Sequence, residues 1–276
     1  MKRLTSIFLI FTLIFALASC GKIENWEEHK AQQSAAEASQ TTQTTATTGK
    51  PPVVKKDKKT KKFKDEKGKT VYVVEVVLPE ITKNCEKSVA EFINTVTNEI
   101  FEEECERAEV NVPSASSYMK NSESKTPWSS ELDFETTYIS SKYVCFLIKK
   151  TISYFGIEGI EPRYETKCFN VQTGAICSVW DFASDPSLEE EITAHLADYM
   201  MKNAPKDFDT EDYAGLSQVY VEKIKTVFNP NQFYLTDEGI GFYFERGDVA
   251  PAYSGVYQRV IPWADLGGYF VHPEEI

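Results

Sequence analysis

Histidine is scarce in this chain of 276 residues, and the short motifs that place catalytic or metal-binding side chains are missing. The three histidines are His29, His195 and His272. None has a second histidine four residues away, so the sequence lacks a helical zinc pair. It also lacks Gly-x-Ser-x-Gly, His-Glu-x-x-His, Cys-x-x-Cys and a phosphate-binding glycine loop. Residues 207–211 are similar to the opening of a calcium loop, but Asp212 and Gln218 stand where glycine and glutamate are needed. We therefore expect no catalytic residue, no metal and no cofactor.

Positive charge is also scarce over most of the chain. The formal net charge is −12, and residues 70–276 hold 16 Lys and Arg against 35 Asp and Glu, a net charge of −19. Contacts to phosphates need a basic face, so this balance excludes nucleic acid as the partner of the folded part. With 42% hydrophobic and 13% aromatic residues, the chain can still build a substantial core.

The chain has no apolar stretch long enough for a permanent membrane helix. Its longest hydrophobic run, residues 7–17, follows Lys2 and Arg3 and is too short to span a bilayer comfortably. Leu17 and the small residues Ala18 and Ser19 then precede Cys20, the pattern of a bacterial lipoprotein signal. We predict a signal peptide at 1–19, cleavage before Cys20 and acylation of its sulfur; an ordinary secretory signal is the alternative. The protein would then be lipid-anchored in the cell envelope, to the inner or the outer membrane, with an extracytoplasmic domain.

Residues 20–70 have too little apolar area to fold alone. Residues 31–49 are almost all Ala, Gln, Ser and Thr, and residues 50–69 hold ten lysines and three acids. This composition predicts a disordered tether that lifts a domain away from the membrane. The lysines would either be solvated or lie on anionic lipid or an acidic wall polymer.

From Val71 onward the patterns predict strands and helices in runs. We expect a strand at 71–78, a helix between Asn84 and Arg107, and strands at 132–138 and 143–148. Further along, we expect a hairpin joining 164–171 to 175–179, helices at 185–203 and 216–228, and strands at 233–235, 240–245 and 256–261. Because strands and helices do not alternate strictly, the class is α+β with a largely antiparallel sheet. We place a small domain at 71–165 and a second at 166–276.

Five cysteines remain if Cys20 is acylated, so at least one stays free. Cys168 and Cys177 fall opposite each other when the chain folds back at Gln172-Thr173. They could form a disulfide, provided that they occupy a non-hydrogen-bonded pair.

Several stretches resemble the RsiV-like family in order and spacing. They are residues 170–174 with 179–182, residues 233–244, residues 249–255 and residues 261–266. The resemblance covers about 166–270, and residues 71–165 look like the smaller α/β domain that precedes it in PdaC-type wall deacetylases. It implies two α/β subdomains outside the cytoplasm, in a family in which lysozyme is a known partner. This chain shows no transmembrane helix and no deacetylase domain, so neither anti-sigma signalling nor deacetylation follows.

Two functions of different classes follow from these observations. The first is a tethered lipoprotein whose acidic domain recognises a cationic protein, with lysozyme as the case that the resemblance implies. The second is a wall-associated enzyme or accessory glycan-binding domain. The 35 acids guarantee some close pairs of carboxylates even without chemistry. For partner contacts we select Glu245, Asp248, Tyr253 and Tyr257, with the loop 156–165, because tyrosines offer contact area and carboxylates complement Lys or Arg.

Overall fold

The structure is a computed structural model that describes residues 49–123, 125–154, 162–203, 217–249 and 255–276. The chain divides into two compact units, 1–43 and 44–276. The first unit lies outside the described residues, so the predicted signal peptide, Cys20 and most of the predicted tether do as well. Within the described ranges, no helix combines the length and apolar character needed to cross a membrane.

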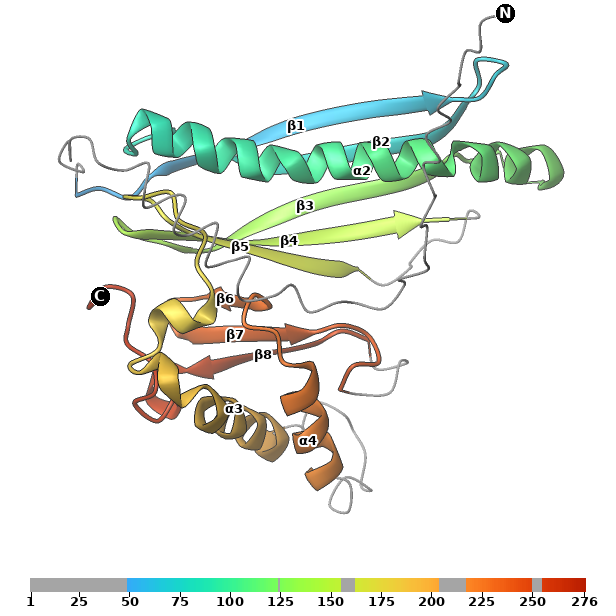
Figure 1. Ribbon diagram of the computed structural model, residues 1–276. Coiled ribbons are helices and arrows are strands. Elements are labelled where there is room, and N and C mark those ends of the chain that lie inside the picture. Colours follow the sequence, from blue (N-terminus) through green and yellow to red (C-terminus); the bar gives the residue numbers. More distant parts are fainter. Residues whose placement is uncertain (1–48, 124, 155–161, 204–216, 250–254) are drawn as a thin grey trace, which may run out of the picture. The chain divides into compact units, whose positions relative to one another are not determined.

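Five strands form the first sheet, in the order β1-β2-β3-β4-β5 (Figure 1). They are β1 (Val53–Lys64), β2 (Thr70–Lys83), β3 (Trp128–Ile139), β4 (Tyr143–Ser153) and β5 (Arg163–Asn170). All neighbours are antiparallel except β2 and β3, which are parallel and joined through helix α2 (Lys87–Asn121). Two parallel strands need such a crossover, because a tight turn reverses the chain direction and can join only antiparallel neighbours.

Helix α2 begins where Glu86 accepts hydrogen bonds from the N–H groups of Ser88 and Val89. Its buried stripe faces the first sheet and includes Val89, Ile93, Ile100 and Ala108. The predicted helix is confirmed at its start but continues fourteen residues beyond Arg107, through Pro113. Proline removes one backbone donor, but buried Ala115 and Met119 keep the last turns packed.

The prediction of a disordered tether over residues 20–70 is wrong for residues 53–64. They form β1, which pairs with β2 along its whole length. Phe63 is buried, and its ring centroid lies 6.5 Å from that of Tyr72. Lys59 donates a hydrogen bond to Asn98 of α2 and lies over the Phe101 ring. An edge strand can keep its lysines in water and still satisfy its backbone against β2, so low apolar content did not prevent folding.

The second layer contains a three-stranded antiparallel sheet in the order β6-β7-β8. Its strands are β6 (Phe233–Leu235), β7 (Gly239–Phe244) and β8 (Tyr257–Pro262), accompanied by helices α3 (Glu189–Asn203) and α4 (Ser217–Val227). Short 3-10 turns lie at Val179–Phe182, Pro186–Leu188 and Trp263–Asp265. A Cβ on Gly241 would come within 2.2 Å of the Tyr234 ring, which covers this glycine from the opposite strand.

Strand β4 separates two hydrophobic cores, which explains its continuous apolar run. Val144, Phe146 and Ile148 belong to the core under α2, whereas Cys145 and Leu147 belong to the core shared with β6, β7, β8, α3 and α4. Alternate residues of a strand point to opposite faces, so both faces of β4 are covered.

The expected fold class is confirmed: the described chain is α+β, with two mostly antiparallel sheets and three α-helices. The expected domain boundary between residues 165 and 166 falls inside β5, and this placement is wrong. The pairing partner of β5 is β4, with Cys145 opposite Cys168, so the first sheet keeps the chain as far as Asn170. A boundary inside a paired strand would break the backbone ladder that stabilises both sides.

Candidate functional site

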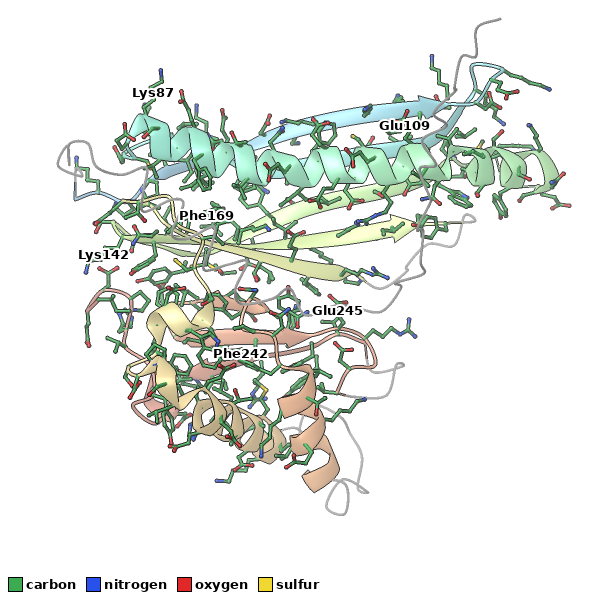
Figure 2. The ribbon with its side chains drawn as sticks, viewed as in Figure 1. Lys87, Glu109, Lys142, Phe169, Phe242 and Glu245 are labelled. Atoms are coloured by element: carbon green, nitrogen blue, oxygen red, sulfur yellow. The ribbon has the colours of Figure 1, made fainter. Side chains whose placement is uncertain are left out.

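Two of the expected contact residues, Glu245 and Asp248, stand at the two ends of a tight turn after β7. The Glu245 N–H donates to Oδ2 of Asp248 at 3.1 Å, and the Asp248 N–H donates to the Glu245 carbonyl at 3.0 Å. Gly247, between them, has a φ of 87°, a conformation that favours glycine. Asp248 therefore shapes the turn, and half-buried Glu245 carries the carboxylate that faces the neighbouring strands (Figure 2).

Tyr257 does not offer its ring to a partner, which corrects the expectation from the sequence. It is 6% exposed and stacks on Phe244, with ring centroids 6.3 Å apart. At the first position of β8 the ring joins the second core, where burial of its area outweighs surface exposure. Tyr253 and residues 156–161 of the expected contact loop lie outside the described residues.

The described end of that loop does meet Glu245, as the sequence hypothesis requires. Burial raises the pKa of Glu245, nearby Arg163 counteracts it, and Asp248 adds to the rise. One residue further, the Tyr164 ring lies 6.1 Å from that of Tyr243, so the start of β5 packs beside the end of β7. The described end of the loop and the turn after β7 therefore contribute to one surface.

Helix α2 adds a buried carboxylate to this surface. The side chain of Glu104 is 4% exposed, and its Oε1 accepts bonds from Lys150 of β4 and, at 3.0 Å, from Arg107. Its Oε2 has no hydrogen-bond partner within the described structure. Burial raises the pKa of Glu104, and the Arg107 guanidinium acts in the opposite direction. A carboxylate buried this deeply needs the nearby cations Lys150 and Arg107 to offset the cost of removing its charge from water.

Glu103, the preceding residue, points to the solvent side of the same cluster. Burial raises its pKa, and the Glu165 carboxylate of β5 raises it further. Glu165 in turn pairs with Lys167 at 3.0 Å. We call these residues the charged cluster: Glu103, Glu104, Arg107, Lys150, Arg163, Glu165, Lys167 and Glu245.

The carboxylates of the charged cluster are groups that can accept hydrogen bonds from polar or cationic side chains. Among the described residues, no group of three or more His, Cys, Asp or Glu side chains is arranged to hold a metal ion. Three of its four carboxylates have raised pKa values, with burial as the largest cause. An approaching ammonium or guanidinium group would favour the charged form of such carboxylates.

The exposed face of α2 adds a negative surface beside the charged cluster, whose four carboxylates are balanced by four cations. Its exposed acids are Glu91, Glu99, Glu102, Glu103, Glu106 and Glu109. Two apolar side chains stand among them, Phe92 at 48% exposure and Val110 at 79%. Figure 2 labels Lys87 and Glu109, which stand near opposite ends of this acidic stretch. Of the three consecutive acids Glu102, Glu103 and Glu104, the first two are exposed and Glu104 is buried.

The helical spacing contains the signal that identifies Glu104. Ile93, Thr97, Ile100, Glu104 and Ala108 follow one another at intervals of three and four, and all are buried. Such a spacing places all five on one face, so the position predicts a buried acid that needs a cation. The identity of that cation could not be predicted, because Lys150 lies 46 residues away on β4.

The two cysteines of the expected disulfide are buried free thiols in the structure. The Cys177 N–H donates to the Cys168 carbonyl at 2.8 Å, so they stand at a hydrogen-bonded position. The condition set for the bridge, a non-hydrogen-bonded pair, is therefore not met. The turn between them forms as expected, with Asn170 accepting from the Gln172 and Thr173 N–H groups and Gly174 at a φ of 82°.

Comparison with known proteins gives a family for part of the chain. Residues 182–264 match a family described as protein of unknown function (DUF3298). The crystal structure of a DUF3298 family member from Bacteroides fragilis is similar in fold, with a TM-score of 0.59 and 12% identity over 81% of this chain and 95% of that one. A DUF3298 family protein from Pseudomonas aeruginosa gives a TM-score of 0.51 and 16% identity over 82% and 96%. No curated protein matches the chain. The part that matches DUF3298 in sequence is thus α3, α4 and the sheet β6-β7-β8, while the two crystal structures share the fold of most of the chain.

Proposed function

We propose that this protein is a lipid-anchored lipoprotein of the bacterial cell envelope whose extracytoplasmic domain binds a cationic protein, with a basic wall hydrolase such as lysozyme as the leading candidate. The observation that carries the proposal is the acidic face of α2 beside the charged cluster. Six exposed glutamates, Glu103 among them, lie together with Glu104 and Glu245 on a part of the chain with a net charge of −19. The pKa values of Glu103, Glu104 and Glu245 are raised. A surface of this kind attracts and orients a basic partner.

Exposed apolar groups within the acidic face support binding of a protein surface. Phe92 and Val110 each leave a large part of the side chain in water. Apolar contacts surrounded by charges are common at protein interfaces, where the apolar part provides affinity and the charges provide orientation.

Support for the anchor comes from the signal at residues 1–20 and from β1. This edge strand carries seven lysines and one aspartate, and six of the lysines are exposed. Within the described structure, the side chains of Lys55, Lys58, Lys62 and Lys64 make neither a hydrogen bond nor an ion pair. Lysines near an anionic bilayer each contribute about 1 kcal/mol, so they would hold this edge toward the headgroups. The resemblance to RsiV-like and PdaC-like proteins supports the same location.

Lysozyme binding is the direct test, using the mature chain from residue 20 with Cys20→Ser. If the acidic surface steers the partner, raising the salt concentration well past 0.15 M should slow association about tenfold or more, because the Debye length there is only about 8 Å. At low salt, the Glu103→Lys variant should associate with lysozyme more slowly than the parent chain does. Glu80→Lys is the matched control: the charge change is the same, and Glu80 is an exposed residue of β2 outside the cluster.

The pH dependence gives the test a second readout. Because the pKa values of Glu103 and Glu245 are raised, these groups lose their charge at a higher pH than ordinary carboxylates. Affinity should therefore begin to fall while the pH is still above 4.5, the ordinary value. The absence of binding at low salt would reject lysozyme as the partner. Turnover of peptidoglycan by the same protein would instead support the wall-enzyme alternative.

A further inference from the structure

Three cysteines form a row across neighbouring strands, on the face of the first sheet that meets the second core. Cys145 of β4 lies directly opposite Cys168 of β5, and Cys177 follows on the other side of Cys168. All three are buried members of the same core. Cys168 therefore has a cysteine of the same core on each side, Cys145 and Cys177. Cys168 can form a disulfide with only one of these two cysteines.

The backbone hydrogen bonds distinguish the two candidate pairs. In an antiparallel strand the N–H and C=O of one residue point to the same neighbouring strand. The Cys168 carbonyl accepts the N–H of Cys177, so the backbone groups of Cys168 point away from β4. Cys145 and Cys168 therefore form a non-hydrogen-bonded pair, whereas Cys168 and Cys177 occupy a hydrogen-bonded position.

Side chains approach more closely in the non-hydrogen-bonded pair. A disulfide needs Cβ atoms about 3.5–4.5 Å apart, and opposite residues in a sheet are about 4.5–5.5 Å apart, with the shorter values in non-hydrogen-bonded pairs. Cys145 thus needs the smaller backbone adjustment to reach Cys168. The Cys177 thiol, in addition, points to the carbonyl of Ala175.

We propose that Cys145 and Cys168 form a disulfide, and that Cys177 stays a free thiol beside it. With oxidised glutathione as the oxidant, the thiolate of one cysteine attacks the glutathione disulfide and releases one glutathione. The second cysteine, as a thiolate, then displaces the other glutathione and forms the protein S–S bond. Two protein thiols are oxidised and one glutathione disulfide is reduced to two thiols.

Burial determines when the bond can form. Cys145 and Cys168 are 0% and 2% exposed, and burial raises the pKa of Cys168 well above its ordinary value. The attacking thiolate and the oxidant must also meet, and neither sulfur is open to solvent, so the folded reduced chain should react slowly. The bond should form during folding, before the second core covers β4 and β5. In the cell this step rests on the proposed location outside the cytoplasm, where disulfides persist.

Peptide mapping after refolding tests the pairing. The mature chain from residue 20 with Cys20→Ser is refolded from the reduced, denatured state in a glutathione redox buffer, and free thiols are then alkylated. Trypsin with chymotrypsin separates Cys168 from Cys177 at Phe169, so mass spectrometry can assign each linkage. We expect Cys145 linked to Cys168 and Cys177 alkylated. A dominant Cys168–Cys177 linkage, or five alkylated cysteines, would overturn the proposal.

Two variants and one control distinguish this pairing from the proposed location. Cys177→Ser should keep the linkage, and Cys145→Ser should lose it without a comparable gain of Cys168–Cys177. If a variant does not fold, the mapping of the parent chain still decides. A linkage that forms in vitro but is missing from protein isolated from the bacterium would contradict the extracytoplasmic location and leave the pairing intact. No linkage in vitro rejects the pairing wherever the protein resides.

Discussion

At the residue scale, Glu104 shows how one acid can join a helix to a sheet. Its Oε1 is bonded by Lys150 from β4 and Arg107 from its own helix, while the side chain is almost entirely removed from water. Lys150 is itself 13% exposed, so neither partner of this pair can become fully hydrated in place. A buried pair of this kind adds little net stability against an apolar replacement, but loss of one member leaves an uncompensated charge.

Glu104→Gln should therefore lower the free energy of unfolding by about 3 kcal/mol. The amide keeps the size of the side chain but cannot balance the Lys150 ammonium. Adding Lys150→Met should recover part of the loss, because the double variant no longer buries an unpaired charge. Chemical denaturation of both single variants and the double variant measures this coupling. If the two single losses simply add in the double variant, the pair does not act as a unit.

At the element scale, β1 marks the limit of arguments from composition. Residues 50–69 have the lysine content of a disordered segment, yet residues 53–64 pair with β2 over twelve positions. One buried ring, Phe63, and the backbone ladder hold the strand, and neither gives a strong hydrophobic pattern. The strand pattern of β2 was clear from the sequence because its residues are buried and β-branched. The sequence did not show that β2 needs a partner strand on its outer edge.

Limited proteolysis tests the order of β1. Trypsin should cut after the lysines of 53–64 about tenfold more slowly than in the denatured chain, which corresponds to an opening free energy of about 1.4 kcal/mol or more. A paired strand does not enter a protease cleft. Phe63→Ser keeps every trypsin site and should raise the cleavage rate, because it removes the buried anchor of the strand. Equal cleavage rates in the native and denatured chains would contradict the pairing of β1.

At the scale of the whole molecule, the sequence predicted the class of fold better than the boundary between domains. The α+β class and most helices and strands from residue 71 onward are correct, since each depends on a local pattern. The boundary at 165/166 is wrong because β5 belongs to the sheet on its N-terminal side, which only tertiary pairing determines. Among the contact residues, Glu245 meets the end of the expected loop, whereas Tyr257 joins the core. Local sequence could not distinguish these two outcomes.

The anchor and the lysines of β1 make separable contributions to membrane attachment, and Cys20→Ala separates them. Acyl chains hold a protein through burial of CH₂ groups, at about 0.8 kcal/mol each, and salt does not weaken that burial. The attraction of the lysines to anionic lipid is screened, with a Debye length of about 3 Å at 1 M salt.

The parent protein should thus stay in the membrane fraction after a 1 M salt wash. Cys20→Ala should either remain unprocessed, because the lipoprotein peptidase needs the modified cysteine, or be shed into the soluble fraction. Any processed variant that stays bound at low salt should be released by the wash, since only the lysines would then hold it. Processed Cys20→Ala protein that resists the wash as the parent does would show that neither the acyl chains nor the lysines anchor the chain.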